Sequence, residues 1–445
     1  MRTFAKSLAA GVLIVLVTFL VTLVLSRVLE YGDFSAYMFM LSVVTLASVP
    51  VKLGVPAFSL RETARHEASG EHGRIVSVWT WSLAVMALNA AVVLAAAGLV
   101  LRYVLDDVQE GLGLFLLAIP FLALIEFLGF TLRGLRHIST GQLVASAFAN
   151  LVTISVLLAA AALGEVSLRD AIAIHVLSLA FACLVSGILL KGRAARILRS
   201  AGTAGLGNRV WFGSVLTLGA ISAIQVFNKN ADILVIGSLG HLDYVGVYKV
   251  AIQLSVLISF ILGITNNITA VYVSKLYFSD RRTEMQAVLS LNVLVIFAVS
   301  ASILAVVLLF GERIVLVLYG EDFARALLPF LVLSIGQFIA AIFGPVGMIL
   351  NMTGHEGRAV RVTFPAMLLN LAALVPMILL FGPVAAAFVN AGFMLGLNLM
   401  LLRLNRRLVG ADPSVFFALG SLLAAGERRD ALVRTAGVIL RSRTL

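Results

Sequence analysis

The chain has 445 residues, of which 61% are hydrophobic and only 12% are charged, and its mean hydropathy is +1.07. A soluble globular domain is about 45–50% apolar and about 25% charged, so this composition excludes a water-soluble fold and predicts a lipid-covered chain. The net charge of +11 is scattered over short loops, which argues against a nucleic-acid partner and is explained by contact with anionic membrane lipids.

Apolar segments of roughly 20 residues, the length that crosses a hydrocarbon core, recur along the chain. The first follows Arg2 and Lys6, is longer than the apolar region of a signal peptide and lacks a cleavage site, so we expect it to be a retained spanning helix. The predicted spans are residues 7–27, 35–60, 75–101, 112–132, 142–163, 171–190, 211–239, 246–273, 287–310, 327–351, 362–381 and 384–402. The predicted fold class is therefore all-α, a polytopic integral membrane protein with about 12 transmembrane helices.

Lys and Arg concentrate on alternate loops between these spans. One of those loops, residues 191–210, carries Lys191 and several arginines, whereas the loops on the opposite side carry isolated arginines such as Arg102 and Arg169. Basic residues favour the cytoplasmic side of a membrane. The distribution predicts an even number of spans with both termini in the cytoplasm.

The two halves of the chain have a similar layout. Asp33 follows the first span and Asp243 follows the seventh, each beside an aromatic residue and just before the chain re-enters the membrane. Parallel repeats of this kind recur in transporters. The predicted organisation is an N-terminal six-helix lobe (1–190), a basic cytoplasmic linker (191–210), a C-terminal six-helix lobe (211–402) and a basic cytoplasmic tail (403–445).

Charged residues inside predicted spans are candidates for function, because each costs at least about 2.5–3.5 kcal/mol at the bilayer centre without a partner or a hydrated cavity. There are five: Lys52, Glu126, Lys229, Asp232 and Lys249. Lys52 lies deep in its span between Pro50 and Pro56, and prolines free carbonyl groups that polar surroundings must satisfy, so we favour a cavity-facing Lys52. Glu126 is expected either to pair with a lysine or to carry a proton.

The seventh span has Asn228, Lys229 and Asp232 close together. Lys229 and Asp232, three residues apart, could pair and hold helices together, or they could line a hydrated cavity, and the two interpretations are compatible. Lys249 lies near the outer end of its span, where its side chain could also extend to the membrane surface. Arg27 and Arg61 stand at span ends, where interfacial anchoring competes with substrate binding.

Several segments together resemble a known family. They are Leu25–Tyr37 (LSRVLEYGDFSAY), Lys52–Pro56 (KLGVP), Arg61–Arg65 (RETAR), Asn230–Gly237 (NADILVIG), Val245–Ala251 (VGVYKVA), Leu318–Ala326 (LYGEDFARA) and Asn351–His355 (NMTGH). The sequence resembles the flippases of lipid-linked oligosaccharides, in the superfamily that includes the multidrug and toxin extrusion transporters. The resemblance implies two parallel six-helix lobes around a central cavity and a polyprenyl-diphosphate-linked glycan as substrate.

The resulting hypothesis is a flippase of the bacterial inner membrane that serves surface polysaccharide synthesis, not an enzyme and without a cofactor. Its substrate-binding candidates are Lys52, Lys229, Lys249, Asn228, Arg27 and Arg61, and its cavity acids are Glu126 and Asp232. A polysaccharide polymerase and other assembly proteins are further partners that the resemblance implies. One alternative is a cation-coupled drug exporter of the same superfamily, and another is a membrane-embedded glycosyltransferase or polymerase. The second lacks support, because such an enzyme should carry a long loop with clustered acids or basic catalytic residues, and no loop before the tail exceeds about 20 residues.

Overall fold

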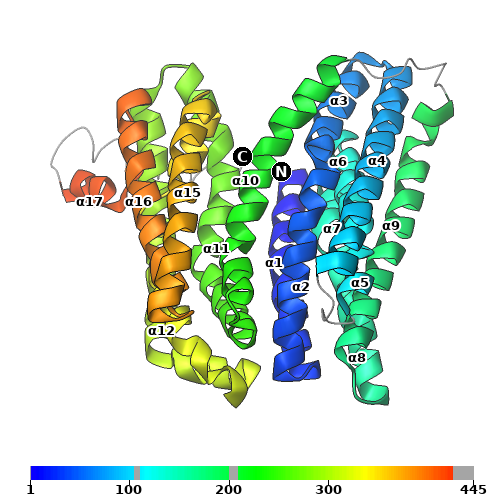
Figure 1. The fold of residues 1–445 in the computed structure, drawn as a ribbon. Coiled ribbons are helices and arrows are strands. Elements are labelled where there is room, and N and C mark those ends of the chain that lie inside the picture. Colours follow the sequence, from blue (N-terminus) through cyan, green and yellow to red (C-terminus); the bar gives the residue numbers. More distant parts are fainter. Residues whose placement is uncertain (1, 105–110, 200–208, 424–445) are drawn as a thin grey trace. The chain divides into compact units, whose positions relative to one another are not determined.

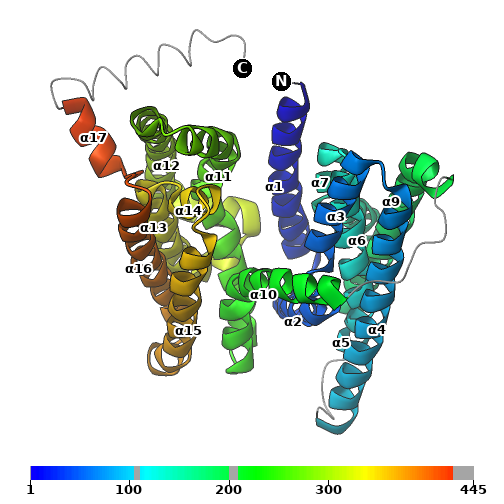
Figure 2. The ribbon, with the colours of Figure 1, turned by 90° about the horizontal axis from the view of Figure 1, so that it is seen from above.

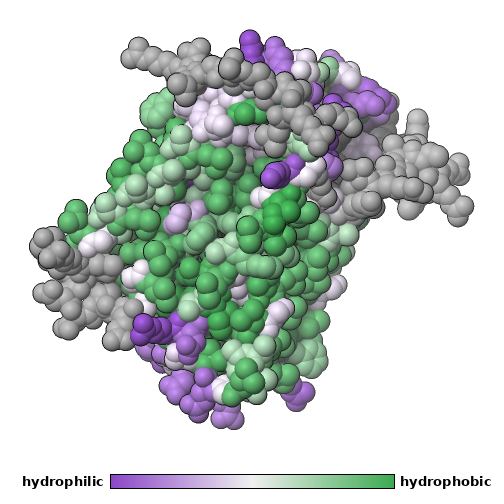
Figure 3. All heavy atoms as spheres, turned by 90° about the vertical axis from the view of Figure 1, so that its right-hand side faces the viewer, coloured by the Kyte–Doolittle hydropathy of each residue, from purple (hydrophilic) through white to green (hydrophobic). Residues whose placement is uncertain are grey.

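The structure is a computed structural model that describes residues 2–104, 111–199 and 209–423 (Figure 1). Within these ranges the regular elements are all helices, and no strand occurs. Eleven helices are long and apolar enough to cross a membrane, and a bent helix pair brings the number up to twelve. On the face that Figure 3 draws, a broad apolar band lies between hydrophilic side chains at its two ends. The predicted all-α, multi-pass fold class is confirmed.

The chain divides into two compact units, Met1–Gly237 and Ser238–Leu445. The first unit contains α1 (Arg2–Val28), α2 (Tyr31–Lys52), α3 (Val55–Ser69), α4 (His72–Val104), α5 (Gly111–Leu116), α6 (Ala118–Gly134), α7 (Ile138–Ser146), α8 (Phe148–Leu163), α9 (Leu168–Arg199) and α10 (Arg209–Ser238). The helices of this unit are blue to green in Figures 1 and 2.

The central helix of the first unit is α6, which packs against α2, α3, α7 and α9. Its contact with α7 is close because two glycines face each other: a Cβ added at Gly129 would fall 2.6 Å from the carbonyl oxygen of Gly141. The polar contact between α6 and α3 joins the hydroxyls of Thr131 and Ser59, 2.9 Å apart. Residues on α6 are therefore held firmly between their neighbours.

Three predicted spans of this unit are broken helices. The span predicted at 35–60 consists of α2 and the first part of α3, the span at 112–132 consists of α5 and α6, and the span at 142–163 consists of α7 and α8, which meet at 45°. Proline explains part of the first break, since Pro50 lies inside α2 and Pro56 begins α3. Hydropathy predicted where these spans lie but not where they break.

The second unit contains α11 (Leu242–Phe278), α12 (Arg282–Tyr319), the 3₁₀ helix η1 (Glu321–Ala326), α13 (Leu327–Phe343), α14 (Val346–Met352), α15 (Glu356–Phe381), α16 (Ala385–Leu408) and α17 (Val415–Leu423). α13 packs against α11, α12 and α16. Gly382, with φ +79°, lies in the turn that separates α15 from α16, so the last two predicted spans are distinct helices. Val415 and Ala418 of α17 pack against α12.

The predicted lobe boundaries stay a prediction. The sequence assigned the span at 211–239 to the C-terminal lobe, whereas the contacts of α10 group it with the first unit. Trp211, near the start of α10, packs against Phe58 of α3 and Trp81 of α4, with ring centroids 5.7 and 5.6 Å away. Residues 200–208 of the predicted linker and 424–445 of the predicted tail lie outside the described residues.

Candidate functional site

The candidate site lies at the break between α2 and α3. Leu53 joins the two helices with φ +45°, a conformation that residues other than glycine seldom adopt. The next residue, Gly54, lies directly against α10: a Cβ at Gly54 would fall 2.5 Å from the backbone nitrogen of Gly219. The break therefore depends on a glycine that lets two backbones meet, and it ends α2 at Lys52.

Lys52 forms an ion pair with Glu126 in the middle of α6, with 2.8 Å between Nζ and Oε2. The Lys52 side chain is 14% exposed and that of Glu126 is 34% exposed. Removing Glu126 would leave the Lys52 ammonium group with little water around it, and an unpaired charge in such surroundings is far more costly than the pair itself. The structure thus explains how a spanning segment tolerates Lys52, and it realises one of the two roles expected for Glu126.

A pocket surrounds this ion pair. Its walls are Val49, Lys52, Leu53, Pro56 and Ala57 from α2 and α3, Glu126 and Phe130 from α6, and Ser222 and Val226 from α10. It holds about 340 Å³ of space that atoms do not fill, part of it open to the outside. Apolar walls around one lysine and one carboxylate are what a site for a charged group needs, because few polar groups then determine what binds.

The polar residues predicted on α10 lie further along the same helix. Ser222, Val226 and Lys229 are spaced four and three residues apart, so they share one helix face, and Lys229 follows the pocket wall by one turn. Asn228 and Lys229 are exposed, while Asp232 is buried, 4% exposed. Among the described residues no ion pair joins Lys229 to Asp232.

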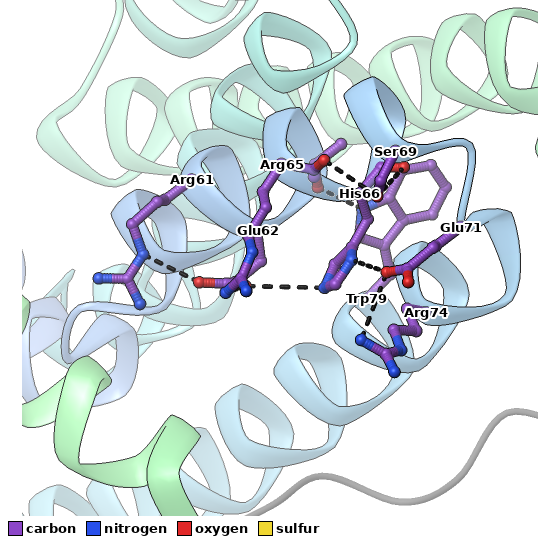
Figure 4. A network of polar contacts seen from close by, with 9 residues as sticks. Arg61, Glu62, Arg65, His66, Ser69, Glu71, Arg74 and Trp79 are labelled. Carbon is purple, nitrogen blue, oxygen red and sulfur yellow. Dashed lines mark hydrogen bonds and ion pairs between the residues drawn. The ribbon is translucent and has the colours of Figure 1, made fainter.

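The remaining predicted residues are separate from the pocket. Arg27 is exposed in the last turn of α1, and Lys249 is partly buried in the second unit, in α11. Arg61 belongs to a polar network at the far end of α3 (Figure 4). Their roles in substrate binding stay predictions.

That network alternates bases and acids across the turn between α3 and α4. Arg61 Nε donates to the buried Glu62 at 2.9 Å, and His66 lies 3.7 Å from Glu62 and 2.7 Å from Glu71, which in turn pairs with Arg74 at 3.3 Å (Figure 4). The hydrogen bond from His66 is the main reason why the pKa of Glu71 is lowered. The network connects two helix ends and does not reach the pocket.

Sequence reasoning overlooked Arg133, one turn after Phe130 on α6. The guanidinium carbon of Arg133 lies 3.7 Å from the centroid of the Phe130 ring, a cation–π contact. The signal was present in the sequence, because Glu126, Phe130 and Arg133 follow one another at helical spacing on one face.

Comparison with solved structures identifies the fold. An inward-facing multidrug resistance MATE family transporter of the MOP superfamily matches with a TM-score of 0.74 at 13% identity, covering 92% of this chain and 98% of the other. An outward-facing transporter of that family has a TM-score of 0.62 at 13% identity, covering 92% and 95%. A MOP superfamily transporter from Pyrococcus furiosus, described by a binding pocket of reverse polarity, has a TM-score of 0.65 at 13% identity, covering 92% and 96%.

The chain is thus a multi-pass membrane protein with the two-lobed MATE transporter fold. A family model described as "polysaccharide biosynthesis protein" matches residues 24–328, so the chain belongs to this family of polysaccharide biosynthesis proteins. The family expected from the sequence motifs is confirmed. A search of curated proteins returns no match to the chain.

Proposed function

We propose that this protein is a flippase that moves a polyprenyl-diphosphate-linked oligosaccharide to the outer leaflet of a bacterial cytoplasmic membrane. The observation that carries the proposal is Lys52, a lysine within a spanning segment that borders a pocket and has Glu126 as its ion-pair partner. The polysaccharide biosynthesis family supports a glycan-bearing substrate, and the MATE fold supports transport.

The physical task is to carry a charged headgroup through hydrocarbon. An ion without a counter-charge is strongly destabilised there, and a lysine binds phosphate as a compact point charge. In the structure Glu126 supplies the counter-charge for Lys52 at 2.8 Å. A diphosphate carries more negative charge than one carboxylate, so it would compete with Glu126 for Lys52. The Glu126 carboxylate neutralises Lys52, and a diphosphate that displaces it would take over this role.

The second candidate is a cation-coupled drug exporter, and the partial exposure of Glu126 is the observation that favours it. In that case Glu126 would bind the cationic substrate or coupling ion, and Lys52 would only balance its charge. The two candidates assign opposite roles to the same ion pair, so substitutions of each partner separate them.

The test measures surface polysaccharide in cells whose own copy of this gene is deleted. Lys52→Ala should reduce surface polysaccharide at least tenfold and cause the lipid-linked precursor to accumulate inside, while Lys52→Arg keeps part of the activity. Lys275→Ala is the control, because Lys275 is an exposed lysine near the end of α11. Normal polysaccharide in Lys52→Ala, or drug sensitivity caused by Glu126→Gln without a polysaccharide defect, would contradict the flippase.

The topology belongs to the same proposal: both termini and the 191–210 segment face the cytoplasm. Reporter fusions at Gly205 and after Leu445 should both give a cytoplasmic signal. A periplasmic signal at either point would contradict the orientation. Assembly proteins such as a polymerase are proposed partners on the outer side, where the translocated glycan is used.

A further inference from the structure

Besides Lys52 and Lys229, a third basic residue, Arg133, is relevant to the site. It lies on the face of α6 that carries Glu126. On α6, Glu126 is followed by Phe130 four residues later and by Arg133 after three more, so the three side chains line one stripe. Glu126 and Phe130 both border the pocket. Arg133 follows Glu126 by seven residues, so it lies about 10 Å further along the axis of α6, toward the end of that helix.

The Arg133 side chain is held in place by its neighbours on α6 and α7. Its guanidinium lies over the Phe130 ring, and its stem is confined by α7, where a Cβ at Gly141 would fall 2.6 Å from Arg133 Cγ. Its Nε atom is buried and has no hydrogen-bond partner in the part of the chain that the structure describes. A buried donor without an acceptor is costly, and the planar guanidinium can donate two parallel hydrogen bonds to a pair of phosphate oxygens.

Lys229 is on the other side of the pocket. Successive spans run in opposite directions, so α6, in the fourth span, and α10, the seventh span, run oppositely through the membrane. Lys229 follows Val226 toward the end of α10, whereas Arg133 lies toward the end of α6. Along the membrane normal, Lys52 is therefore between Arg133 and Lys229. We call these three residues the cation row.

We propose that Arg133 is the first binding residue for the diphosphate on the cytoplasmic side, from which the headgroup passes along the cation row to Lys52 and Lys229. This inference rests on the proposed function. The Phe130 ring contacts the Arg133 guanidinium on one side and borders the pocket on the other. It therefore separates Arg133 from Lys52, the first two residues of the cation row. A headgroup on Arg133 gives its unpaired Nε an acceptor before the ion pair of Lys52 has to open. The row replaces one large desolvation step with several smaller ones.

The test measures, by thermophoresis, the binding of farnesyl diphosphate to the purified full-length protein in detergent. Arg133→Gln should raise the Kd five- to tenfold, and Arg133→Lys should raise it less, because lysine keeps the charge but not the fork of donors. Arg136→Gln is the matched control: it removes the same charge from an exposed arginine just beyond α6, and its Kd should be unchanged. Farnesol, which lacks the diphosphate, should bind all four proteins equally weakly.

Melting temperatures recorded on the same samples separate binding from folding, and Arg133→Lys provides a second variant if Arg133→Gln is unstable. An unchanged Kd in Arg133→Gln, with a raised Kd in Lys52→Ala, would overturn the role of Arg133 and leave the proposed function standing. An equal loss of affinity for farnesyl diphosphate in Arg133→Gln and Arg136→Gln would also overturn it. Such a result would indicate only a general attraction between the basic surface and the diphosphate. Wild-type protein that does not distinguish farnesyl diphosphate from farnesol would overturn both proposals.

Discussion

Polar clusters of opposite character lie beside the two ends of α3. At its start, one lysine meets one carboxylate inside spanning helices, beside a pocket with apolar walls. At its end, a chain of acids and bases runs from Arg61 to Arg74, and most of its charged members, among them Arg61, Glu71 and Arg74, are exposed (Figure 4). Exposed ion pairs contribute about 0–1 kcal/mol each, whereas breaking an ion pair away from water costs several times more. The Lys52–Glu126 pair, and not the network at the other end of α3, should therefore control both stability and transport.

The largest effect is expected from separating the partners of the pocket. Lys52→Ala and Glu126→Ala should each lower the stability of the purified protein by about 1–3 kcal/mol, less than for a fully dry pair because Glu126 is partly exposed. The double variant Lys52→Ala/Glu126→Ala should recover most of this stability and yet remain inactive in polysaccharide export. Export restored in the double variant would show that the pair only joins helices.

The next effect concerns the close contact between Gly54, at the start of α3, and α10. Gly54→Val should lower stability by about 1–3 kcal/mol, because its side chain would collide with the backbone of α10 at Gly219. The control is Gly98→Ala in α4, where the added Cβ meets nothing within 4 Å and should be neutral or slightly stabilising. Equal melting temperatures for both variants would contradict the tight α3–α10 contact.

A smaller effect is expected at Lys229, a cation that is exposed and has no ion pair among the described residues. Lys229→Ala should leave the amount of protein in the membrane unchanged and reduce export several-fold, because the loss alters the field that the headgroup meets. Asp232→Asn should be milder, since its side chain is buried away from that surface. Abundance lost in both single variants and regained together with export in the double variant would identify a structural pair.

The smallest effect is at the exposed end. Because the folded-state pKa of Glu71 is lowered, its contribution to stability is present above the ordinary carboxyl pKa of about 4.3 and is lost as the pH falls through the lower folded value. Wild type and Glu71→Gln should therefore differ by a constant, small amount in melting temperature between pH 7 and 5. The difference should shrink below that range. A difference that grows on acidification would contradict the sign of this linkage.

Hydropathy predicted the spans well because a 30 Å hydrocarbon layer leaves few ways to arrange an apolar chain. Pro50 and Pro56 led to the expectation that Lys52 has polar surroundings, and the structure places the Glu126 carboxylate and a pocket beside it. Neither could predict that Lys52 meets Glu126, because that contact joins different spans and depends on how α6 packs against α2. The exact break at Leu53 and Gly54 depends on α10, which no local pattern near residue 53 reveals.

Arg133 illustrates a second limit. Its position at the end of a span made it one of many basic residues expected at a membrane surface, and charge counting treats all of these alike. What distinguishes it is an aromatic ring beneath its guanidinium and a glycine against its stem, both of which are matters of packing. Helical spacing alone indicated the stripe with Glu126, but not that the Nε atom would lack an acceptor.

The break between α2 and α3 also makes α3 a lever. The helix has 15 residues, so its far end lies about 22 Å from Leu53. A rotation of about 10° at the break would carry the Ser69 end through roughly 4 Å, while Lys52, beside the pivot, would barely move. A rearrangement small enough to leave the ion pair intact could thus displace the whole α3–α4 turn, and a spin-label pair between Ser69 and α6 would detect it.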